Sequence, residues 1–192
     1  MLVAFHKPFG ILSQFNPNPN EPEQGTLKAF DLPRQVLPLG RLDMDSEGLL
    51  LFTDEKELEH RLLHPKFQHR RRYLVLVEGT PEPTHLDHLR SGTIIIKGHR
   101  CLPCRAKLLQ EKPAWVGPRT PPVRVRQSIT DSWLRLELRE GKNRQVRRMT
   151  AAAGFPTLRL LREGIGNFPI GDLQPGQWKE LNPEERAAIF AR

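Results

Sequence analysis

The apolar residues of this chain come in short runs, and this limits the folds that it can adopt. The longest runs, Leu49–Phe52 and Ile94–Ile96, have the length of a strand and are far too short to cross a membrane. Many runs follow one another without a helical crossover between them, which favours antiparallel pairing. The sequence therefore predicts an α+β fold with a mixed, mostly antiparallel sheet.

Short segments along the whole chain are predicted as strands. In one of them, Trp133–Leu138, apolar and charged residues alternate, as on a sheet with one face in solvent. The predicted strands are Leu2–His6, Leu49–Thr53, Tyr73–Glu78, Thr93–Lys97, Arg105–Gln110, Val123–Ile129, Trp133–Leu138 and Leu158–Arg162.

Capping residues, prolines and glycines mark the predicted helices between these strands. An acceptor followed three residues later by an acidic residue is typical of a helix start, and proline or glycine is typical of a helix end. The expected boundary residues are Asp54, Glu57 and Pro65 for a first helix, Thr84, Asp87 and Gly92 for a second, and Asn182, Pro183 and Glu185 for a C-terminal one.

The charge balance of the chain is strongly basic. There are 30 Lys and Arg against 22 Asp and Glu, which gives a net charge of +8 and a pI of about 10.0. This balance favours a polyanionic partner such as a nucleic acid, because release of counterions from phosphates drives such binding. A soluble basic protein without such a partner is the alternative.

Metal ligands are sparse. Cys101 and Cys104 form a lone CxxC without a second ligand pair, so we expect two reduced thiols and no metal. His60 and His64 are four apart, but Arg61 stands where a zinc protease would have a glutamate.

The first residues, MLVAFHKPFG, lack the features of a signal peptide, and we expect a cytoplasmic protein.

Two segments have the composition of loops. Asn16–Gly25 is polar and rich in proline, and Glu111–Pro122 is rich in proline but contains Trp115 and basic residues. A plain loop rarely needs a tryptophan, so the second segment is predicted to be either a packed or an RNA-facing insertion.

The segment LGRLDMDSEGLLLFTDE places several charged residues in a short polar turn directly before an apolar strand. Arg41, Asp43, Asp45 and Glu47 all fall within this turn. Acidic residues at such a place are commonly turn formers or caps. The functional alternative is a carboxylate held rigidly at the edge of a strand, with Arg41 keeping it ionised.

The segment HRRRYLVLVEG joins a basic run to a predicted strand. It spans His69–Gly79, and its strand begins at Tyr73, the only tyrosine of the chain. The run is either a solvated basic turn or a phosphate contact beside an aromatic platform for a base.

The segment LREGKNRQVRRMTAAAG predicts an amphipathic helix that begins at Asn143 and ends at Gly154. Its apolar face would consist of Val146, Met149 and Ala153, and its opposite face of Arg144, Arg147 and Arg148. No acidic residue lies four positions from these arginines within the helix. This favours a phosphate or a distant carboxylate as their partner, although a solvated face is the common alternative.

Two of these segments resemble the signatures of a known enzyme family. GRLDMDSEGLLLFT is similar to the GRLD signature of pseudouridine synthases of the RsuA type. EGKNRQVRRM followed by GFPTLRLLREGIG is similar to their C-terminal signature, and the two lie about 100 residues apart in the expected order. The resemblance extends from FHKPFGILSQF to LQPGQWKEL. PAWVGPRTPPVRVRQSITDSWL is similar to a segment distinctive of the branch that acts on 23S ribosomal RNA.

The resemblance implies roles for individual residues. Asp43 matches the essential carboxylate of GRLD, and Tyr73 matches a tyrosine that stacks on the target base and helps to move its proton. Arg147 matches the basic residue that pairs with the catalytic Asp. Arg41 would help to position the flipped nucleotide. Leu160 or Leu161 would form the apolar wall of the base pocket, and the sequence does not decide between them.

Beyond these residues, Arg144 and Arg148 are expected to bind RNA phosphates. The resemblance also implies one two-lobed catalytic domain over residues 1–192 with a central cleft and no separate N-terminal RNA-binding domain. The expected partner is 23S ribosomal RNA or an early large-subunit assembly intermediate, bound by a monomer that needs no cofactor, metal or membrane. A binding-only RNA module is the alternative, whereas a DNA-binding regulator has little support because no helix-turn-helix or zinc-finger pattern is present.

Overall fold

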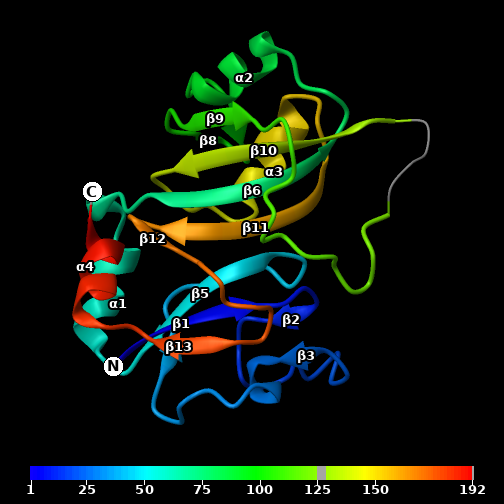
Figure 1. Cartoon of the computed structure of the whole chain (residues 1–192). Coiled ribbons are helices and arrows are strands. Elements are labelled where there is room, and N and C mark those ends of the chain that lie inside the picture. Colours follow the sequence, from blue (N-terminus) through cyan, green and yellow to red (C-terminus); the bar gives the residue numbers. More distant parts are fainter. Residues whose placement is uncertain (125–128, 192) are drawn as a thin grey trace. The chain divides into compact units, whose positions relative to one another are not determined.

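The computed structural model describes residues 1–124 and 129–191, and the chain divides into two compact units. The first unit combines Met1–His69 with the C-terminal segment from Leu161, and the second comprises Arg70–Leu160. Strand β11 (Thr157–Ile165), orange in Figure 1, crosses from the second unit into the first at Leu161.

The first unit is built on a sheet with the strand order β13-β1-β5-β11. Strand β1 pairs antiparallel with both of its neighbours, whereas β5 pairs parallel with β11. Every residue of β1 and β5 is buried. The strands of this unit besides β11 are β1 (Leu2–Lys7), β2 (Ile11–Leu12), β3 (Gly25–Thr26), β4 (Leu37–Pro38), β5 (Glu47–Thr53), β12 (Phe168–Pro169) and β13 (Trp178–Glu180).

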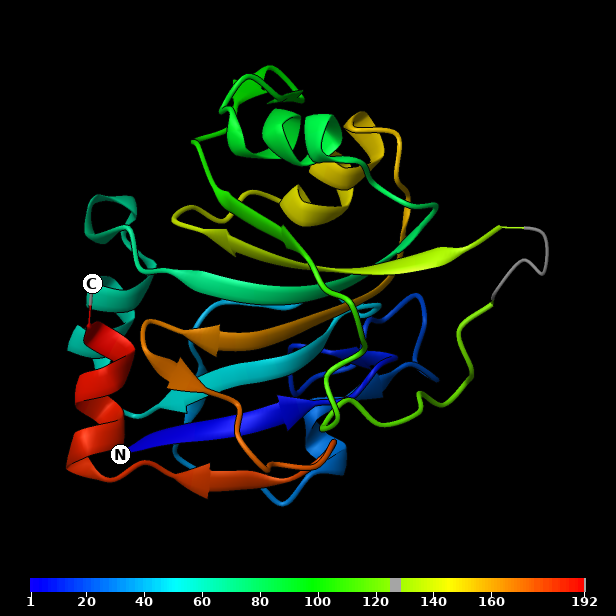
Figure 2. The same ribbon diagram turned by 45° about the horizontal axis from the view of Figure 1, so that its top comes forward.

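Two α-helices of the first unit lie side by side, as Figures 1 and 2 both show. The guanidinium of Arg61 lies over the ring of Phe190 at 4.5 Å from its centroid, which joins the two helices. Residues Asn182 and Glu185 form the predicted capping box of the C-terminal helix. The helices of this unit are η1 (Leu27–Ala29), α1 (Lys56–Leu63), η2 (Pro65–Phe67) and α4 (Pro183–Phe190).

The predicted capping box of Asp54 and Glu57 at α1 is wrong. The residue before the helix is Glu55, and its side chain does not cap. The carboxylates there bind cations instead: Asp54 accepts from the N-terminal amine at 2.6 Å, and Glu55 from both terminal nitrogens of Arg186 at 2.7 and 2.9 Å. Hydrogen bonding to Arg186 lowers the pKa of Glu55 to about 2. A charged partner from a distant segment therefore prevails over the local cap.

The second unit packs two helices on one face of an antiparallel sheet with the strand order β6-β10-β9. Its core joins Leu86 and Leu89 of one helix and Val146 and Met149 of the other to the inner faces of the strands. Figure 2 shows both helices on the same side of these strands. The elements are β6 (Arg71–Glu78), α2 (Pro83–Arg90), β7 (Ile95–Ile96), β8 (His99–Arg100), β9 (Arg105–Leu108), β10 (Asp131–Leu138) and α3 (Gln145–Ala152).

Two predicted elements of the second unit differ from the observed ones. Helix α2 begins at Pro83, because the Glu82 N–H donates to Nδ1 of His85 and Thr84 lies inside the helix. The strand predicted at Thr93–Lys97 is only the short pair β7 with β8. The strand predicted at Val123–Ile129 falls largely on residues 125–128, outside the described residues.

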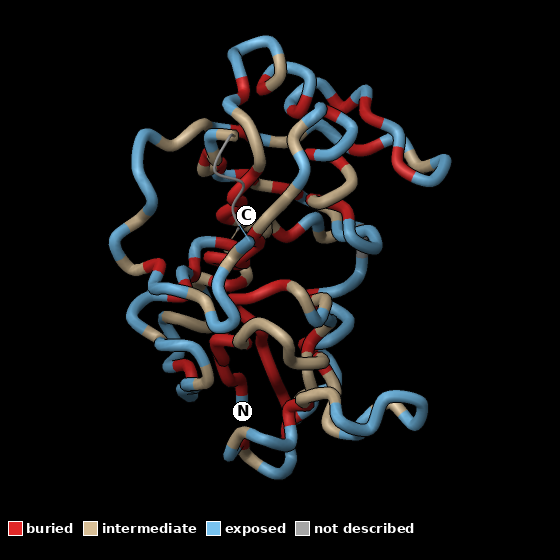
Figure 3. Tube along the Cα trace, turned by 90° about the vertical axis from the view of Figure 1, so that its right-hand side faces the viewer, coloured by how far each residue is buried: buried red, intermediate tan, exposed pale blue. Residues whose placement is uncertain are grey.

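The main sequence expectation for the fold is confirmed. The fold is α+β, and most strand pairs are antiparallel, with β5–β11 and β2–β3 as parallel pairs. In Figure 3 the trace directly after the N-terminus is coloured as buried, in agreement with the burial of every residue of β1. No helix within residues 1–124 and 129–191 is long and apolar enough to span a membrane.

Candidate functional site

Asp43 lies in the loop between β4 and β5 of the first unit, and both ends of that loop are fixed by backbone hydrogen bonds. The Leu39 N–H donates to the Leu51 carbonyl at 2.7 Å, and the Ser46 N–H donates to the Asp43 carbonyl at 3.0 Å. The second bond closes a turn that leaves Asp43 partly exposed. The dense acidic residues of this segment thus do form a turn, and Asp43 lies in that turn four residues before β5 begins at Glu47.

A buried hydroxyl holds the residue before Asp43. Ser13 Oγ donates to the Leu42 carbonyl at 2.7 Å and accepts from the Leu42 N–H at 3.0 Å. Both partners are buried, with Ser13 only 4% exposed. One side chain therefore satisfies both main-chain groups of the residue that precedes the carboxylate, which fixes the direction in which Asp43 leaves the backbone.

The residue after Asp43 is held in a similar way. The Met44 carbonyl accepts from the Gly10 N–H at 2.9 Å, with Lys7 Nζ at 3.5 Å. Lys7 is fully buried and also donates to the carbonyls of Pro8 and Ile11 at 2.9 and 2.7 Å. Burial lowers the pKa of Lys7 to about 8, although nearby carboxylates oppose the shift. Its ammonium therefore joins β1 to the segment that directly follows it and to the loop that carries Asp43.

Gly48 allows β5 to approach β11 closely just beyond this loop. It has φ +102°, and a side chain there would place Cβ 2.4 Å from the Arg162 carbonyl oxygen and 2.6 Å from the Arg162 nitrogen. In the parallel register, Gly48 stands beside Arg162 and Glu47 beside Leu161. The glycine of the GRLDMDSEGL segment is thus required by the close packing of two backbones.

Tyr73 is placed at the edge of the hydrophobic core of the second unit. It stands opposite Leu136 in the β6–β10 register and packs, partly buried, against the core cluster. The preceding arginines Arg70, Arg71 and Arg72 are also only partly exposed, and all three have interaction partners. The basic run is therefore not a freely solvated turn.

Helix α3 carries the predicted basic face, but it begins at Gln145 and not at Asn143. Arg144 precedes it in a left-handed conformation with φ +51°, which stops the helix from extending further back. The predicted apolar face is confirmed, because Val146, Met149 and Ala153 are buried in the core. On the other face, Arg148 donates to Asn143 Oδ1 at 2.7 Å and Arg147 lies 3.4 Å from the Thr157 carbonyl.

Glu140 organises the start of α3, and sequence analysis did not identify it. Its carboxylate accepts from Gln145 Nε2 at 2.6 Å, from the Leu102 N–H at 2.8 Å and from His99 Nε2 at 2.8 Å. Burial alone would raise the pKa of Glu140, but these hydrogen bonds outweigh it and hold the pKa below its ordinary value. The carboxylate thereby ties the segment around Cys101 to the beginning of the helix.

Comparison with known proteins gives the chemistry of this fold. Residues 1–152 match the family model described as RNA pseudouridylate synthase. The chain belongs to the RNA pseudouridylate synthase family. It is 48% identical to Ribosomal large subunit pseudouridine synthase E of Xanthomonas campestris, covering 93% of this chain and 94% of that protein. It is 42% identical to the protein of the same name from Vibrio vulnificus, covering 94% and 75%.

The fold itself matches a solved structure of the same class. A crystal structure of a pseudouridylate synthase superposes with a TM-score of 0.79 at 24% identity, covering 98% of this chain and 73% of that one. As a member of this family the chain is an RNA-modifying isomerase, which confirms the resemblance drawn from its two signatures. The binding-only module and the DNA-binding regulator are set aside.

The predicted site residues of this synthase fall into two groups. Arg41, Asp43 and Leu161 belong to the first unit, with Arg41 exposed and Leu161 buried opposite Glu47. The other predicted residues belong to the second unit, and of these Leu160 lies in the core cluster against which Tyr73 packs. The second-unit residues are Tyr73, Arg144, Arg147, Arg148 and Leu160.

The insertion around Trp115 is packed along part of its length. Val116 is only 1% exposed, its carbonyl accepts from Lys112 Nζ at 2.6 Å, and the buried Arg159 donates to the Gly117 carbonyl at 2.8 Å. Trp115 itself is partly buried. The packed alternative therefore holds for Val116, while contact of Trp115 with RNA stays a prediction.

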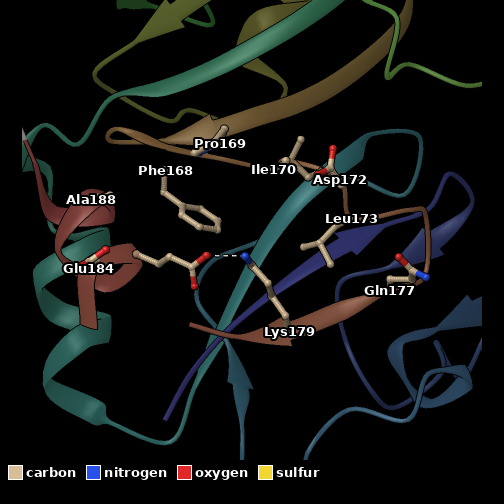
Figure 4. Close-up of a pocket in the computed structure, with 11 residues that line it drawn as sticks. Phe168, Pro169, Ile170, Asp172, Leu173, Gln177, Lys179, Glu184 and Ala188 are labelled. Atoms are coloured by element: carbon tan, nitrogen blue, oxygen red, sulfur yellow. Dashed lines mark hydrogen bonds and ion pairs between the residues drawn. The ribbon is translucent and has the colours of Figure 1, made fainter. Parts of the chain in front are cut away.

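A pocket of about 560 Å³ in the first unit is lined by none of the predicted site residues. Figure 4 shows Phe168, Ile170 and Lys179 among the residues that line it. The ammonium of Lys179 forms an ion pair with Glu185 of α4. That ion pair neutralises the two charges, and its hydrogen bond lowers the pKa of Glu185.

Among the described residues, no group of three or more His, Cys, Asp and Glu side chains could hold a metal, and Cys101 and Cys104 are free thiols.

Proposed function

We propose that this synthase converts a specific uridine of 23S ribosomal RNA to pseudouridine, with Asp43 as the catalytic carboxylate. The observation behind the substrate is the set of relatives named Ribosomal large subunit pseudouridine synthase E, which are 42–49% identical over 91–94% of this chain. The similarity of GRLDMDSEGLLLFT to the family signature supports the choice of Asp43, and the clamped loop around it is the kind of support that a catalytic side chain needs.

The reaction rearranges the nucleoside without a net change in atoms. The bond between ribose C1′ and uracil N1 breaks, the base turns, and a bond forms between C1′ and C5. C5 loses a proton and N1 gains one, so the atoms balance and no electrons are exchanged with a second reactant. The chemistry therefore needs neither a redox cofactor nor ATP.

Asp43 can serve this reaction in either of two ways. As a nucleophile it attacks the ribose and holds it while the base turns, and as a base it removes a proton from the ribose. Both roles require an ionised carboxylate with a fixed direction of approach, because misplacement by even 1 Å is costly. The hydrogen bonds of Ser13 to Leu42 and of Gly10 to Met44 support either role.

The target base must leave its stack before it can react, which costs a few kcal/mol. We assign Tyr73 to stack on the flipped base, an interaction worth about 1–3 kcal/mol. We assign Leu160, and not Leu161, to the apolar wall, because Leu160 lies in the same core cluster against which Tyr73 packs. In this assignment one side of the second unit's core would provide both apolar contacts to the base.

The arginines supply charge for the polyanionic substrate. Arg147 is proposed to pair with Asp43, as the family signatures imply, and a double-mutant cycle of the two residues measures that coupling. Arg41 is proposed to position the flipped nucleotide, since it is exposed two residues before Asp43. Arg144 and Arg148 are proposed to bind RNA phosphates beside α3.

The substrate is proposed to be protein-poor 23S RNA or an early assembly intermediate, because a mature ribosome buries much of its RNA. Pseudouridine mapping of total RNA from cells that lack this gene tests the assignment. Loss of one 23S site supports it. Loss of a 16S or tRNA site instead would keep the chemistry and reject the substrate.

A second experiment tests the reaction independently of the natural substrate. Ribosomal RNA that contains 5-fluorouridine should be processed or trapped by the wild-type protein. Asp43→Asn should bind the same RNA without processing it. If Asp43→Asn processes it at the wild-type rate, the catalytic assignment is wrong and Asp45 becomes the candidate.

A further inference from the structure

The register of the second unit's sheet separates a core face from an opposite face. Residues directly paired across antiparallel strands point to the same side. The core face contains the row of Tyr73, Leu136 and Ala106, which pack in or against the core cluster. The opposite face contains the rows Arg72–Glu137–Arg105 and Leu74–Arg135–Lys107. Along β10 these are followed by Trp133, which pairs with Leu76, and by the acidic pair of Asp131 and Glu78 at the end of the strands.

The outer part of this opposite face is basic and open to solvent. We call Arg105, Lys107, Trp133, Arg135 and Glu137 the β9–β10 face. Arg105 has a side chain that is 75% exposed, and Lys107 and Arg135 are also exposed. Glu137 is the only acidic member of this set, and its side chain is 14% exposed and lies 3.5 Å from Arg105. The face as a whole is therefore positive.

The arrangement of charges on this face suits an anionic ligand. Arg135 and Lys107 stand directly opposite each other on neighbouring strands, and like charges at such positions repel. Glu137 lies in the next row, where its carboxylate is shared between Arg105 and, at 4.0 Å, Arg70. A chain of phosphates along the two strands would lie close to the positive charges of both Arg135 and Lys107.

Trp133 adds a feature that a merely solvated basic face does not need. It lies on the same face as Arg135, two residues away on β10, and its side chain is partly buried and partly exposed. Proteins that bind single-stranded nucleic acid combine basic side chains that follow the backbone with aromatic rings on which bases stack. A tryptophan beside exposed cations on a sheet face has this combination.

We propose that the β9–β10 face binds a single-stranded segment of the RNA substrate, with a base stacked on Trp133 and phosphates on Arg105, Lys107 and Arg135. This rests on the RNA substrate proposed above and extends it to a surface that includes none of the residues assigned to catalysis. The face would increase the affinity for RNA outside the reacting nucleotide without taking part in the chemistry.

Binding of a single-stranded oligoadenylate to the full chain tests the proposal. The probe contains no uridine, so its binding does not depend on turnover. Arg105→Glu and Lys107→Glu should each weaken binding by about fourfold or more near physiological salt and lower the log–log salt slope by about 0.7. Lys56→Glu makes the same change of charge on the exposed start of α1, in the first unit, and should leave the affinity unchanged.

Trp133 is tested separately because stacking is less sensitive to salt than phosphate contact. Trp133→Leu should weaken oligoadenylate binding about fivefold or more with an unchanged salt slope. Trp133→Phe keeps an aromatic ring and should retain most of the affinity, which excludes loss of folding as the cause. If Lys107→Glu behaves like Lys56→Glu, or if Trp133→Leu binds like wild type, the proposal is overturned. Competition by polyglutamate as effective as that by oligoadenylate also overturns it, because it would indicate an acidic protein partner.

Turnover measurements distinguish this proposal from the proposed function. On a 23S transcript, Lys107→Glu should raise KM with kcat unchanged at saturation, whereas Asp43→Asn should lose kcat and keep its affinity. If wild type does not modify the transcript, the substrate assignment fails, and the oligoadenylate data still decide the role of the β9–β10 face.

Discussion

The loop that carries Asp43 and the helix that carries Arg147 are held in place by different means. Around Asp43 the main chain itself is fixed, by Ser13 on Leu42 and by Gly10 on Met44. Helix α3 is fixed by apolar packing of one face and by Glu140 at its start, which leaves the opposite face to the arginines. The position of a carboxylate on a short side chain is set mainly by the backbone to which it is attached, so that backbone must be rigid. Long arginine side chains can adjust to a phosphate on their own.

The largest effect should come from removing the charge of Asp43. Asp43→Asn keeps the size of the side chain and should lower kcat by at least about 1000-fold, within the range ascribed to acid–base and nucleophilic groups. RNA affinity should stay within about twofold, measured by filter binding at fixed salt. Turnover within tenfold of wild type would show that the fixed loop serves another residue.

A substitution at Gly48 tests how far the geometry of the Asp43 loop depends on the close approach of β5 to β11. Gly48→Ala places a methyl group 2.4 Å from the Arg162 carbonyl oxygen in a left-handed conformation. The free energy of unfolding should fall by about 3 kcal/mol or more, measured by urea titration. Gly154→Ala is the matched control, because it also has positive φ but has nothing within 4 Å of the added methyl. Equal losses for the two variants would mean that backbone strain, and not the close approach, sets the requirement for glycine.

Glu140 tests the support of α3. Glu140→Gln should lower the free energy of unfolding by about 2 kcal/mol near pH 7, because hydrogen bonds to a charged acceptor are lost. The pKa of Glu140 is lowered in the folded state, so its contribution is present above the ordinary value of 4.5 and is lost as the pH falls below it. Urea titrations of variant and wild type should therefore converge as the pH falls from 4.5 through the lower pKa that Glu140 has in the folded state. If the difference in the free energy of unfolding between Glu140→Gln and wild type persists in acid, the loss of stability comes from altered packing and not from the charge of Glu140.

A substitution at Ser13 tests whether its two hydrogen bonds to Leu42 fix the geometry of the Asp43 loop. Ser13→Ala removes both hydrogen bonds to Leu42 and should cost about 1–2 kcal/mol of stability. It should also lower kcat by about tenfold with KM unchanged, since only the orientation of the Asp43 carboxylate is affected. Ser13→Thr retains the hydroxyl and should recover most of kcat. A loss of stability without a loss of kcat would show that the loop keeps its geometry unaided.

Arg148 should show the smallest effect. Arg148→Glu should weaken RNA binding by about fourfold near physiological salt and lower the log–log slope by about 0.7 for a single-stranded site. Its present partner, Asn143 Oδ1, is a neutral group, so Asn143→Ala is the control for loss of that local contact. Weaker binding with an unchanged slope would make the role of Arg148 structural.

Local signals in the sequence predicted most elements of this fold. Alternation predicted the strand from Trp133, the pair Asn182 and Glu185 predicted the cap of α4, and Gly154 predicted the end of α3. The failure at the start of α1 has a non-local cause, because a distant partner decided the outcome. Arg186, 131 residues away, binds the side chain of Glu55 beside the predicted cap of α1. No local pattern contains that information.

The candidate site was predictable only in part for the same reason. The signatures supplied Asp43, Tyr73 and the arginines as residue types in order along the chain. The residues that position them could not be found this way, because Ser13 reaches Leu42 across 29 residues and Glu140 reaches Leu102 across 38. A serine or glutamate in a polar stretch gives no sign of such a partner.

The division of the chain has a consequence for its synthesis. The first unit is discontinuous, and its sheet pairs β1, which is made before the second unit, with β13, which is made after it and includes Trp178. The second unit is one continuous stretch from Arg70 to Leu160 and can complete its core while the remainder is still being made. The first unit must wait for β13 and α4 to leave the ribosome. Until then one edge of β1, a fully buried strand in the folded protein, remains unpaired and is available to chaperones and to aggregation.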